Sequence, residues 1–266
     1  MSDLLDFTTT LARAAGQILR EKYLQPREIH AKGWRDFYTD ADLAAQTAIV
    51  ETIQSHDAHA AILSEEGLNP PPGATSLWVI DPLDGTSNYA RHLPLFAVSI
   101  AYVEQGQPIV GVVYDPIHDH VFAAEHDRGA WLNADRLRVA TTTAIAEGII
   151  GLDWGRDERP RGFALDWINR TGRECRTVRA LGSAALGLCY LAAGQLDVYF
   201  HGSLKPWDGA AGQVIAEEAG ARLFNFAGER WSYTEPDCIA CTPQLTAWAR
   251  RSIAARGAHD TIHSAA

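Results

Sequence analysis

Two aspartates close together, followed by a glycine and small polar residues, make one segment of the sequence well suited to chemistry. In Ser76-Leu-Trp-Val-Ile-Asp81-Pro-Leu-Asp84-Gly-Thr-Ser-Asn88, an apolar strand ends at one carboxylate and a second follows three residues later. An Asp-Gly turn that only closes a strand is common. Two features favour a function instead. Acids at the carboxyl end of a strand lie where α/β folds place their sites, and Gly-Thr-Ser-Asn resembles a helix start, whose free N–H groups accept an anion such as phosphate.

Two further segments end or begin an element with acids. Ile62-Leu-Ser-Glu65-Glu66-Gly67 is a short apolar run that ends in two glutamates. In Lys205-Pro206-Trp207-Asp208-Gly, a proline suited to the first helical turn precedes an aspartate. The helix dipole favours an acid in that turn without any ligand, so each segment taken alone is ambiguous.

The four carboxylates of Glu65, Asp81, Asp84 and Asp208 become informative when they are taken together. Two unit charges about 4 Å apart repel by roughly 4 kcal/mol at an effective dielectric constant near 20. If the fold gathers the four, they need protons or cations to offset that repulsion. Carboxylates and backbone carbonyls are hard oxygen ligands suited to Mg²⁺, which also binds substrate phosphate oxygens. The pattern predicts metal-assisted phosphoryl transfer to water.

The segment Asp36-Phe-Tyr-Thr39-Asp40-Ala-Asp42 precedes a predicted helix. Thr39 and Asp42 have the spacing of a capping box, which any helix start can carry. From the residues alone, capping is the preferred interpretation of Asp42.

Composition limits the possible functions. The chain has 266 residues, a formal net charge of −10 and no stripe of basic residues, which disfavours nucleic acid as a direct ligand. No apolar run approaches the roughly 20 residues of a spanning helix, and the acidic N-terminus does not look like a secretory signal, so we expect a cytoplasmic protein without a membrane segment. Of the four cysteines, Cys238 and Cys241 fall in a strand-like run, and we expect them to be core thiols on opposite faces of a strand rather than a redox pair.

The elements that must position these residues follow from apolar spacing and turn residues. Two helices, an antiparallel hairpin and further strands are expected first, followed by alternating short strands and helices, which predicts an α/β (α+β) layered sandwich. We interpret the chain as a single domain with an antiparallel-rich lobe, about 1–142, and an α/β lobe, about 143–266. Helices are expected at 3–24, 39–55, 161–170, 183–193, 206–219 and 243–256, and strands at 61–64, 76–80, 95–104, 108–114, 118–125, 130–132, 148–152, 196–200 and 221–224.

The motifs resemble those of the inositol monophosphatase family, which belongs to the Mg²⁺-dependent, lithium-sensitive phosphatases. The resemblance runs from about residue 5 to residue 255. It is carried by Asp36-x-x-Thr39-x-x-Asp42, Glu65-Glu66, Asp81-Pro-Leu-Asp84-Gly-Thr86-x-Asn88 and Trp207-Asp208-x-Ala-Ala-Gly. Weaker similarity is found in Val113-Tyr-Asp-Pro116, Arg128-Gly-Ala-Trp-Leu-Asn133 and Arg179-x-x-Gly182-Ser-Ala-Ala185.

The resemblance implies a role for each matching residue. It implies two or three Mg²⁺ ions per site, with one metal held by Glu65, Asp81 and the carbonyl of Leu83 and another by Asp81, Asp84 and Asp208. Thr86, hydrogen-bonded to Asp42, would activate the attacking water, which replaces capping as the preferred interpretation of Asp42, and Glu65 joins these two as a catalytic residue. The implied substrate contacts are Asp84, Gly85, Thr86, Ser183, Ala184, His201 and Asp208.

The family also implies a layered α/β fold, a small phosphorylated metabolite as substrate and a homodimer. Lys32 does not match, because its spacing to Asp36 differs from that of the family lysine by one residue. His201 occupies the position, seven residues before Asp208, where relatives that act on inositol phosphate tend to carry an acid. A neutral imidazole forms one hydrogen bond at each nitrogen but cannot act as a two-oxygen acceptor.

Three interpretations of the function remain open. The first is a phosphatase for inositol monophosphate or a similar polyol or sugar phosphate. The second is a histidinol-phosphate, fructose 1,6-bisphosphate or 3′-nucleotide phosphatase with the same chemistry. The third is a regulatory or RNA-associated binding protein with this fold. The segment Gly151-Leu-Asp153-Trp154-Gly-Arg156 could supply a carboxylate or a cation to a different leaving group, whereas His118 and His120 are expected to face solvent rather than hold a metal.

Overall fold

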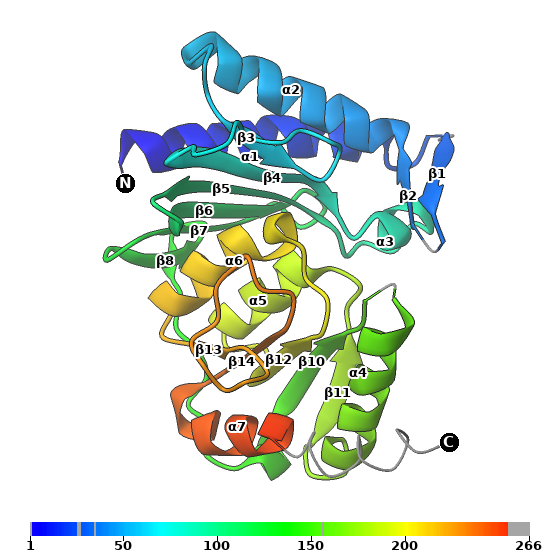
Figure 1. Ribbon diagram of the computed structural model, residues 1–266, viewed down its shortest axis with the longest axis vertical. Helices are drawn as coiled ribbons and strands as arrows, with labels where there is room; N and C mark the ends of the chain where they lie inside the picture. Colours follow the sequence, from blue (N-terminus) through cyan, green and yellow to red (C-terminus); the bar gives the residue numbers. More distant parts are fainter. Residues whose placement is uncertain (1, 26–27, 35, 156, 255–266) are drawn as a thin grey trace.

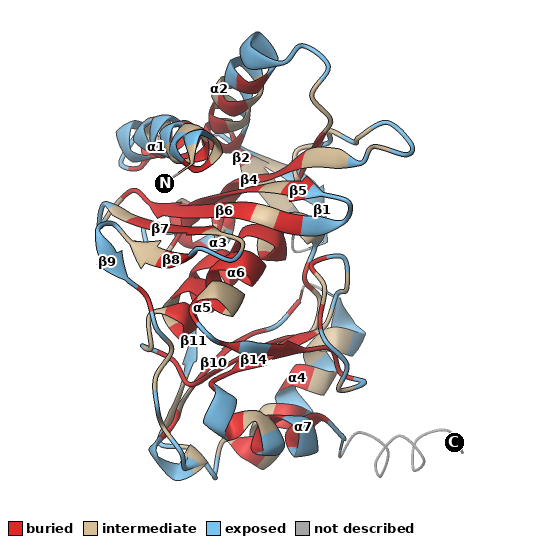
Figure 2. Cartoon of the chain, turned by 90° about the vertical axis from the view of Figure 1, so that its left-hand side faces the viewer, coloured by how far each residue is buried: buried red, intermediate tan, exposed pale blue. Residues whose placement is uncertain are grey.

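Helices and sheets alternate in layers in the computed structural model of the chain, which describes residues 2–25, 28–34, 36–155 and 157–254 (Figure 1). A helix pair covers the outer face of a seven-stranded sheet, a second pair fills the space between this sheet and a five-stranded sheet, and a third pair covers the far face (Figures 1 and 2). The layered α/β architecture predicted from the sequence is confirmed.

The seven-stranded sheet has the order β3-β4-β5-β6-β7-β8-β9, in which β3 and β4 are parallel and all other neighbours are antiparallel. Buried valine, isoleucine and alanine side chains lie on both faces of its central strands, as expected for a sheet covered on both sides. The strands are β3 (Ile62–Ser64), β4 (Ser76–Asp84), β5 (Ala97–Glu104), β6 (Gln107–Asp115), β7 (His120–Glu125), β8 (Gly129–Leu132) and β9 (Asp135–Arg136).

The outer helix pair consists of α1 (Asp3–Lys22) and α2 (Asp40–His56). The first turn of α1 is capped by Ser2, whose hydroxyl accepts a hydrogen bond from the N–H of Leu5 at 3.2 Å. Both helices bury an apolar stripe against the sheet, in a cluster that includes the following residues: Leu5, Leu11, Leu19, Ile49, Ile53, Ile80, Ile100 and Val112.

The five-stranded sheet has the order β11-β10-β12-β14-β13, in which β10 is parallel to both β11 and β12. Helices α4 and α7 cover its outer face, where Trp167 stacks on Phe200 with ring centroids 4.2 Å apart. The elements of this part of the chain are β10 (Ile149–Asp153), α4 (Glu158–Thr171), β11 (Thr177–Ala180), α5 (Ala184–Ala192), β12 (Val198–His201), α6 (Pro206–Glu218), β13 (Arg222–Phe224), β14 (Cys238–Cys241) and α7 (Thr246–Ala254).

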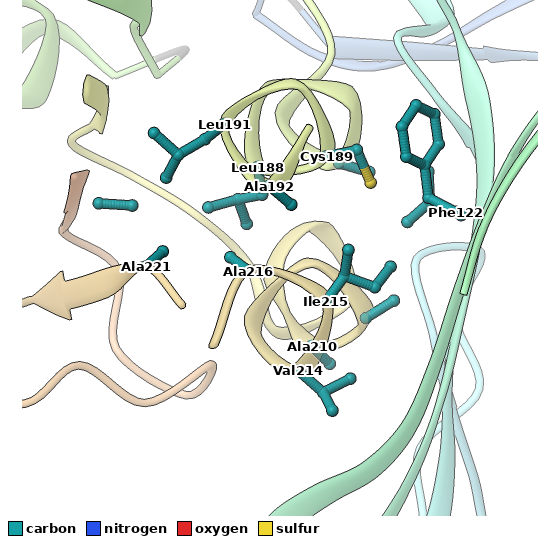
Figure 3. Packing of buried hydrophobic residues seen from close by; sticks show 14 of the residues in the cluster. Phe122, Leu188, Cys189, Leu191, Ala192, Ala210, Val214, Ile215, Ala216 and Ala221 are labelled. Carbon is teal, nitrogen blue, oxygen red and sulfur yellow. The ribbon is translucent and has the colours of Figure 1, made fainter. Parts of the chain in front are cut away.

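Helices α5 and α6 lie side by side between the two sheets and are almost entirely buried (Figure 3). Small residues allow this close packing. A Cβ on Gly212 of α6 would lie 2.5 Å from Leu188 of α5, and a Cβ on Gly111 of β6 would lie 2.9 Å from the Cα of Ala211. The central core therefore joins residues from both halves of the chain, while the two-lobe division near residue 142 stays a prediction.

Most expected elements are present, but strands β9 and β11 lie where none was expected, and β4 extends past residue 80 to Asp84. Three further differences concern an N-terminal hairpin, β7 and the closing helix. The hairpin of β1 (Ile29–Gly33) and β2 (Asp36–Thr39) was not expected, and it precedes α2 directly. The strand expected from residue 118 begins at His120. The closing helix expected over 243–256 is divided, because a 3₁₀ turn at Pro243–Leu245 precedes α7, and residues 255 and 256 lie outside the described residues.

The cysteine prediction is confirmed. Cys238 and Cys241 are free, fully buried thiols at the two ends of β14. Cys238 packs in the central core and Cys241 in the core beneath α4 and α7, so they face opposite sides of the sheet. Across the described residues, none of the helices combines the length and the apolar character of a membrane span.

Candidate metal centre and active site

The first two aspartates of the candidate site lie at an irregular end of β4. Asp81 is paired with Ser99 of β5, but Asp84 is paired with Ala97, so three residues advance on β4 for two on β5. Pro82 lies in this interval and has no N–H for the ladder, which explains why the regular pairing is interrupted there. The irregular pairing brings the carboxylates of Asp81 and Asp84 close together.

The third aspartate comes from the middle helix layer. Asp208 is the third residue of α6, and its carboxylate accepts a hydrogen bond from the N–H of Lys205 at 2.8 Å. One oxygen of Asp208, one of Asp81 and one of Asp84 lie within 4.8 Å of one another. Residues more than 120 positions apart in the sequence therefore meet, as the sequence predicts. We call Glu65, Asp81, Asp84 and Asp208 the acidic cluster.

The electrostatics of Asp81 confirm that like charges gather here. Burial raises the pKa of its carboxyl group well above the ordinary value, and the negative charges of Glu65, Asp84 and Asp208 raise it further. One compensating donor is the N–H of Leu83, 2.9 Å from Asp81 Oδ1. The arrangement favours either a bound proton or a cation among these oxygens.

Glu65 follows β3, and its N–H donates to the carbonyl of Ile80 on β4, which holds it beside Asp81. Lys32, at the end of the β1–β2 hairpin, contacts this position. Its Nζ lies 2.5 Å from Glu66 Oε1 and 3.7 Å from Glu65 Oε1. The spacing of Lys32 to Asp36 differs from that of the family lysine, so no role was predicted for Lys32. The β1–β2 hairpin nevertheless brings its side chain to Glu65 and Glu66.

Asp42 uses its two oxygens for two different contacts. Oδ2 accepts hydrogen bonds from the N–H and the hydroxyl of Thr39, at 2.8 and 2.6 Å, so the capping box is present. Oδ1 accepts from the hydroxyl of Thr86 at 3.4 Å, and this hydroxyl also lies 3.1 Å from the carbonyl oxygen of Leu83. Capping and the Thr86 contact therefore coexist. Burial raises the pKa of Asp42 to about 7, despite the hydrogen bonds from Thr39.

The carboxylate of Asp84 accepts hydrogen bonds from residues at the start of α5. The hydroxyl of Ser183 donates to Asp84 Oδ2, as does the N–H of Ala185 at 2.9 Å, while the N–H of Ala184 lies 3.3 Å from Oδ1. Ser183 and Ala184, expected near the substrate, are thus joined directly to the acidic cluster. Gly85, with φ +90°, precedes α3 (Thr86–Ala90), and a Cβ there would lie 2.9 Å from the carbonyl oxygen of Leu95, so the tight turn requires glycine.

His201 ends β12 and is paired with Asp153 of β10. Burial lowers its pKa to about 4, so the ring is neutral at physiological pH. The N–H of Ser203 donates to His201 Nδ1 at 3.0 Å, which places the ring proton on Nε2. The ring therefore offers a donor at Nε2, where an acid would offer acceptors.

Two further groups of residues contain histidine side chains that could hold a metal. His118 is exposed, and its Nδ1 lies 2.7 Å from Asp115 Oδ2, while His120 is half-buried and stacks on His118 with ring centroids 5.7 Å apart. Neither belongs to a cluster of metal-ligating atoms among the described residues. A second such cluster, which the sequence did not indicate, consists of His126, Asp127 and Glu218. Both oxygens of Glu218 accept backbone N–H groups there, from Asp127 and Gly129.

Known proteins resemble the chain over nearly its full length. The model of the inositol monophosphatase family matches residues 1–259. A protein of Escherichia coli K12 called Nus factor SuhB is 41% identical over 251 residues, which cover 92% of this chain and 93% of that protein. A fructose-1,6-bisphosphatase/inositol-1-monophosphatase of Thermotoga maritima is 36% identical over 228 residues, 85% of this chain and 86% of the other. The structure of an IMPase from the same organism matches with a TM-score of 0.89, 32% identity, and 96% and 98% coverage.

Proposed function

The chain belongs to the inositol monophosphatase family, and we propose that it is a Mg²⁺-dependent phosphomonoesterase that hydrolyses a small phosphorylated polyol or sugar. One observation carries the proposal: carboxylate oxygens of Asp81 and Asp84, from the end of β4, and of Asp208, from the start of α6, lie within 4.8 Å of one another. Inositol monophosphate is the substrate that the family favours.

The oxygens of the acidic cluster are of the type that Mg²⁺ prefers. Glu65, Asp81 and the carbonyl of Leu83 would hold one ion, and Asp81, Asp84 and Asp208 another. When bound, Mg²⁺ would neutralise the carboxylates and the phosphate oxygens and lower the pKa of water. The pKa of Asp81 is raised first by burial and then by the neighbouring negative charges, and a cation would relieve that repulsion, which supports this assignment.

The residues around the acidic cluster provide the proton chemistry. The Thr86 hydroxyl lies between Asp42 and the Leu83 carbonyl, where it would orient the attacking water. A carboxyl group with a pKa of about 7, such as that of Asp42, exchanges a proton readily near neutral pH and would accept the proton of that water. Glu65, whose charge acts on Asp81, would help to position the same water. The N–H groups of Gly85 and Thr86 would hold the phosphate for in-line attack.

His201 bears on the choice of leaving group. Its Nε2 proton would donate to an oxygen of the leaving group, together with contacts from Ser183 and Ala184 at the start of α5. Sugar hydroxyls and a second phosphate both contain suitable acceptors. Fructose 1,6-bisphosphate, histidinol phosphate and a 3′-nucleotide are therefore the alternative substrates to compare with inositol monophosphate.

A phosphate-release assay over these four compounds, with Mg²⁺ and with EDTA, tests the proposal. We expect Mg²⁺-dependent release that is fastest for inositol monophosphate or a sugar phosphate. Asp84→Asn is the matched control, because it replaces a proposed ligand by a residue of the same shape. Equal release by the variant would contradict the assigned site.

A second candidate function is favoured by the similarity to Nus factor SuhB. A protein of this type would act by binding a component of a transcription complex, and the excess of acids favours a protein over RNA as the direct contact. Absence of phosphate release from all four compounds, in a protein that still binds Mg²⁺, would favour this candidate.

The assembly and location that we propose also follow the family. We infer a homodimer in the cytoplasm, acting on a small phosphorylated metabolite. Light scattering at micromolar concentration is expected to give twice the mass of one chain, 29.0 kDa. A monomer would contradict the dimer without affecting the proposed chemistry.

A further inference from the structure

A buried carboxylate outside the acidic cluster is engaged by the turn that leads into α5. Asp153, the last residue of β10, accepts the N–H of Leu181 at 3.1 Å and the N–H of Gly182 at 2.7 Å, both on Oδ1. The hydroxyl of Tyr199 donates to Oδ2 at 3.0 Å. All three donors belong to the protein itself. Two of them come from the turn at residues 181–183, which we call the Gly182 turn.

The last residue of the Gly182 turn and the first residues of α5 hold a proposed metal ligand, Asp84. Ser183 donates its hydroxyl to Asp84, and the N–H groups of Ala184 and Ala185 point at the same carboxylate. The N–H that Gly182 donates to Asp153 and the hydroxyl that Ser183 donates to Asp84 therefore belong to neighbouring residues. A displacement of the Gly182 turn would move three donors of Asp84 together.

The Gly182 turn is held from its other side by Asn88. The side-chain amide of Asn88 donates to the carbonyl of Leu181 at 2.8 Å and to that of Leu95 at 2.7 Å. Gly182 has φ +72°, and a Cβ there would lie 2.9 Å from the Asn88 amide nitrogen. The Gly182 turn thus forms hydrogen bonds both with the carboxylate of Asp153, in the five-stranded sheet, and with the side-chain amide of Asn88, in α3.

Tyr199 links the same carboxylate to the body of α5. Its ring is fully buried, and a Cβ on Gly187 of α5 would lie 2.2 Å from it, so ring and helix are in direct contact. The hydroxyl of this ring fixes the orientation of Asp153. The carboxylate therefore contacts, directly or through Tyr199, both the turn before α5 and the helix itself.

Resting on the proposed function, we propose that Asp153 is a positioning residue of the metal centre. Through the Gly182 turn it holds the Ser183 hydroxyl and the first N–H groups of α5 against Asp84. If this acceptor is removed, the N–H groups of Leu181 and Gly182 lose their partner in a partly buried turn, which favours reorganisation of the turn. Residues that orient a ligand in this way typically change metal affinity by 10- to 100-fold.

Three variants test the inference. Asp153→Ala removes the acceptor, whereas Asp153→Asn keeps an oxygen for both N–H groups and serves as the conservative rescue. Asp115→Ala is the matched control: Asp115 is also buried at a strand end and accepts the N–H groups of Ile117 and His118, but in a different loop. The readouts are Mg²⁺ binding by calorimetry with inorganic phosphate present, and hydrogen exchange of the amides at residues 184–186.

We expect Asp153→Ala to bind Mg²⁺ about tenfold more weakly and to exchange the 184–186 amides about tenfold faster. Asp153→Asn is expected to stay within about threefold of the unaltered protein, and Asp115→Ala to leave both readouts unchanged. Unchanged exchange and unchanged Mg²⁺ binding in Asp153→Ala would overturn the inference.

Two further outcomes are distinguishable. If Asp153→Ala does not fold, Tyr199→Phe decides, because it removes only one donor to the same carboxylate; unchanged exchange at 184–186 in that variant overturns the inference. If the unaltered protein takes up no Mg²⁺, the proposed function fails, while faster exchange in Asp153→Ala would still support the role of Asp153 in holding α5.

Discussion

Asp115 and Asp81 both lie at or near the ends of strands in the seven-stranded sheet and are almost fully buried, but their surroundings differ. Asp115 accepts two backbone N–H groups and contacts the ring of His118. Asp81 accepts one N–H and faces the negative charges of Glu65, Asp84 and Asp208. The first arrangement satisfies a charge and stabilises a loop. The second gathers charges that repel, which lowers stability unless a cation binds.

The comparison shows how the electrostatic surroundings of a buried acid indicate a functional site. A buried acid whose oxygens meet backbone donors needs no further explanation. A cluster of buried acids whose members raise one another's pKa is costly, and such clusters are concentrated at functional sites.

Asp84→Asn should have the largest effect. Removing one carboxylate from the acidic cluster takes away a proposed ligand shared with the start of α5, and we expect kcat/KM to fall by about a thousandfold or more. Circular dichroism should show that the fold is intact. Near-normal Mg²⁺-dependent turnover in this variant would mean that Asp84 is not a ligand.

The pH dependence of stability should reveal two buried acids whose pKa values are raised, Asp42 and Asp153. The folded-state pKa values of Asp42 and Asp153 are raised to about 7 from the ordinary value of 3.8, because both are buried. The folded state therefore keeps these protons at pH values where the unfolded chain has lost them. Their contribution is complete below about pH 4 and is lost as the pH rises to 7, on the order of 2–4 kcal/mol for each group.

Urea unfolding without metal, from pH 4 to pH 8, measures this loss. His201 has the opposite sign: its lowered pKa weakens the folded state as the pH falls from about 6.5 towards 4. Asp153→Asn should reduce the decline between pH 4 and 7. A metal-free stability that rises steadily over that interval would contradict the assignment of raised pKa values.

Asparagine substitutions at the two compared positions should change metal-free stability in opposite directions. Asp81→Asn keeps an acceptor for the N–H of Leu83 and removes one of the clustered charges, so we expect a gain of about 1–3 kcal/mol. Asp115→Asn keeps acceptors for its loop but loses the charged contact with His118, at a cost of about 1 kcal/mol. Thermal unfolding in EDTA compares them; changes of the same sign would show that the repulsion at Asp81 is unimportant.

Lys32→Gln should have the smallest effect. The Lys32 ammonium group partly offsets the charges of Glu65 and Glu66, but it is partly exposed to solvent, so its loss should lower metal-free stability by only about 0.5–1 kcal/mol. The difference should shrink when Mg²⁺ is added. A stabilised variant would indicate that Lys32 does not compensate the glutamates.

Residues whose role follows from local sequence were predicted well. The turn at Gly85 and the helix start at Pro206 each have a local signature, and the structure has both. The strand expected to end at Asp81 is present as well, but it continues through an irregular pairing to Asp84. The meeting of Asp208 with Asp81 is not local; it could be anticipated through the family resemblance and through the repulsion that a cation would relieve.

Contacts set by the packing of distant elements were not predictable in the same way. Lys32 reaches Glu66 because an unexpected hairpin brings it there, and its sequence spacing gave no sign of this. Asp153 was noted as an available carboxylate for a leaving group, whereas the structure engages it with Leu181, Gly182 and Tyr199. A single aspartate at a strand end carries no signal that distinguishes these roles. Arg156, from the same segment, lies outside the described residues.

Anomalous diffraction from crystals soaked in Mn²⁺ and inorganic phosphate tests directly whether the acidic cluster binds divalent cations. Mn²⁺ takes the oxygen ligands that suit Mg²⁺, and its position can be identified from its anomalous signal. We predict peaks bounded by the carboxylates of Glu65, Asp81, Asp84 and Asp208. Crystals that show ordered carboxylates but no peak there at millimolar Mn²⁺ would contradict the proposal that the acidic cluster binds metal ions.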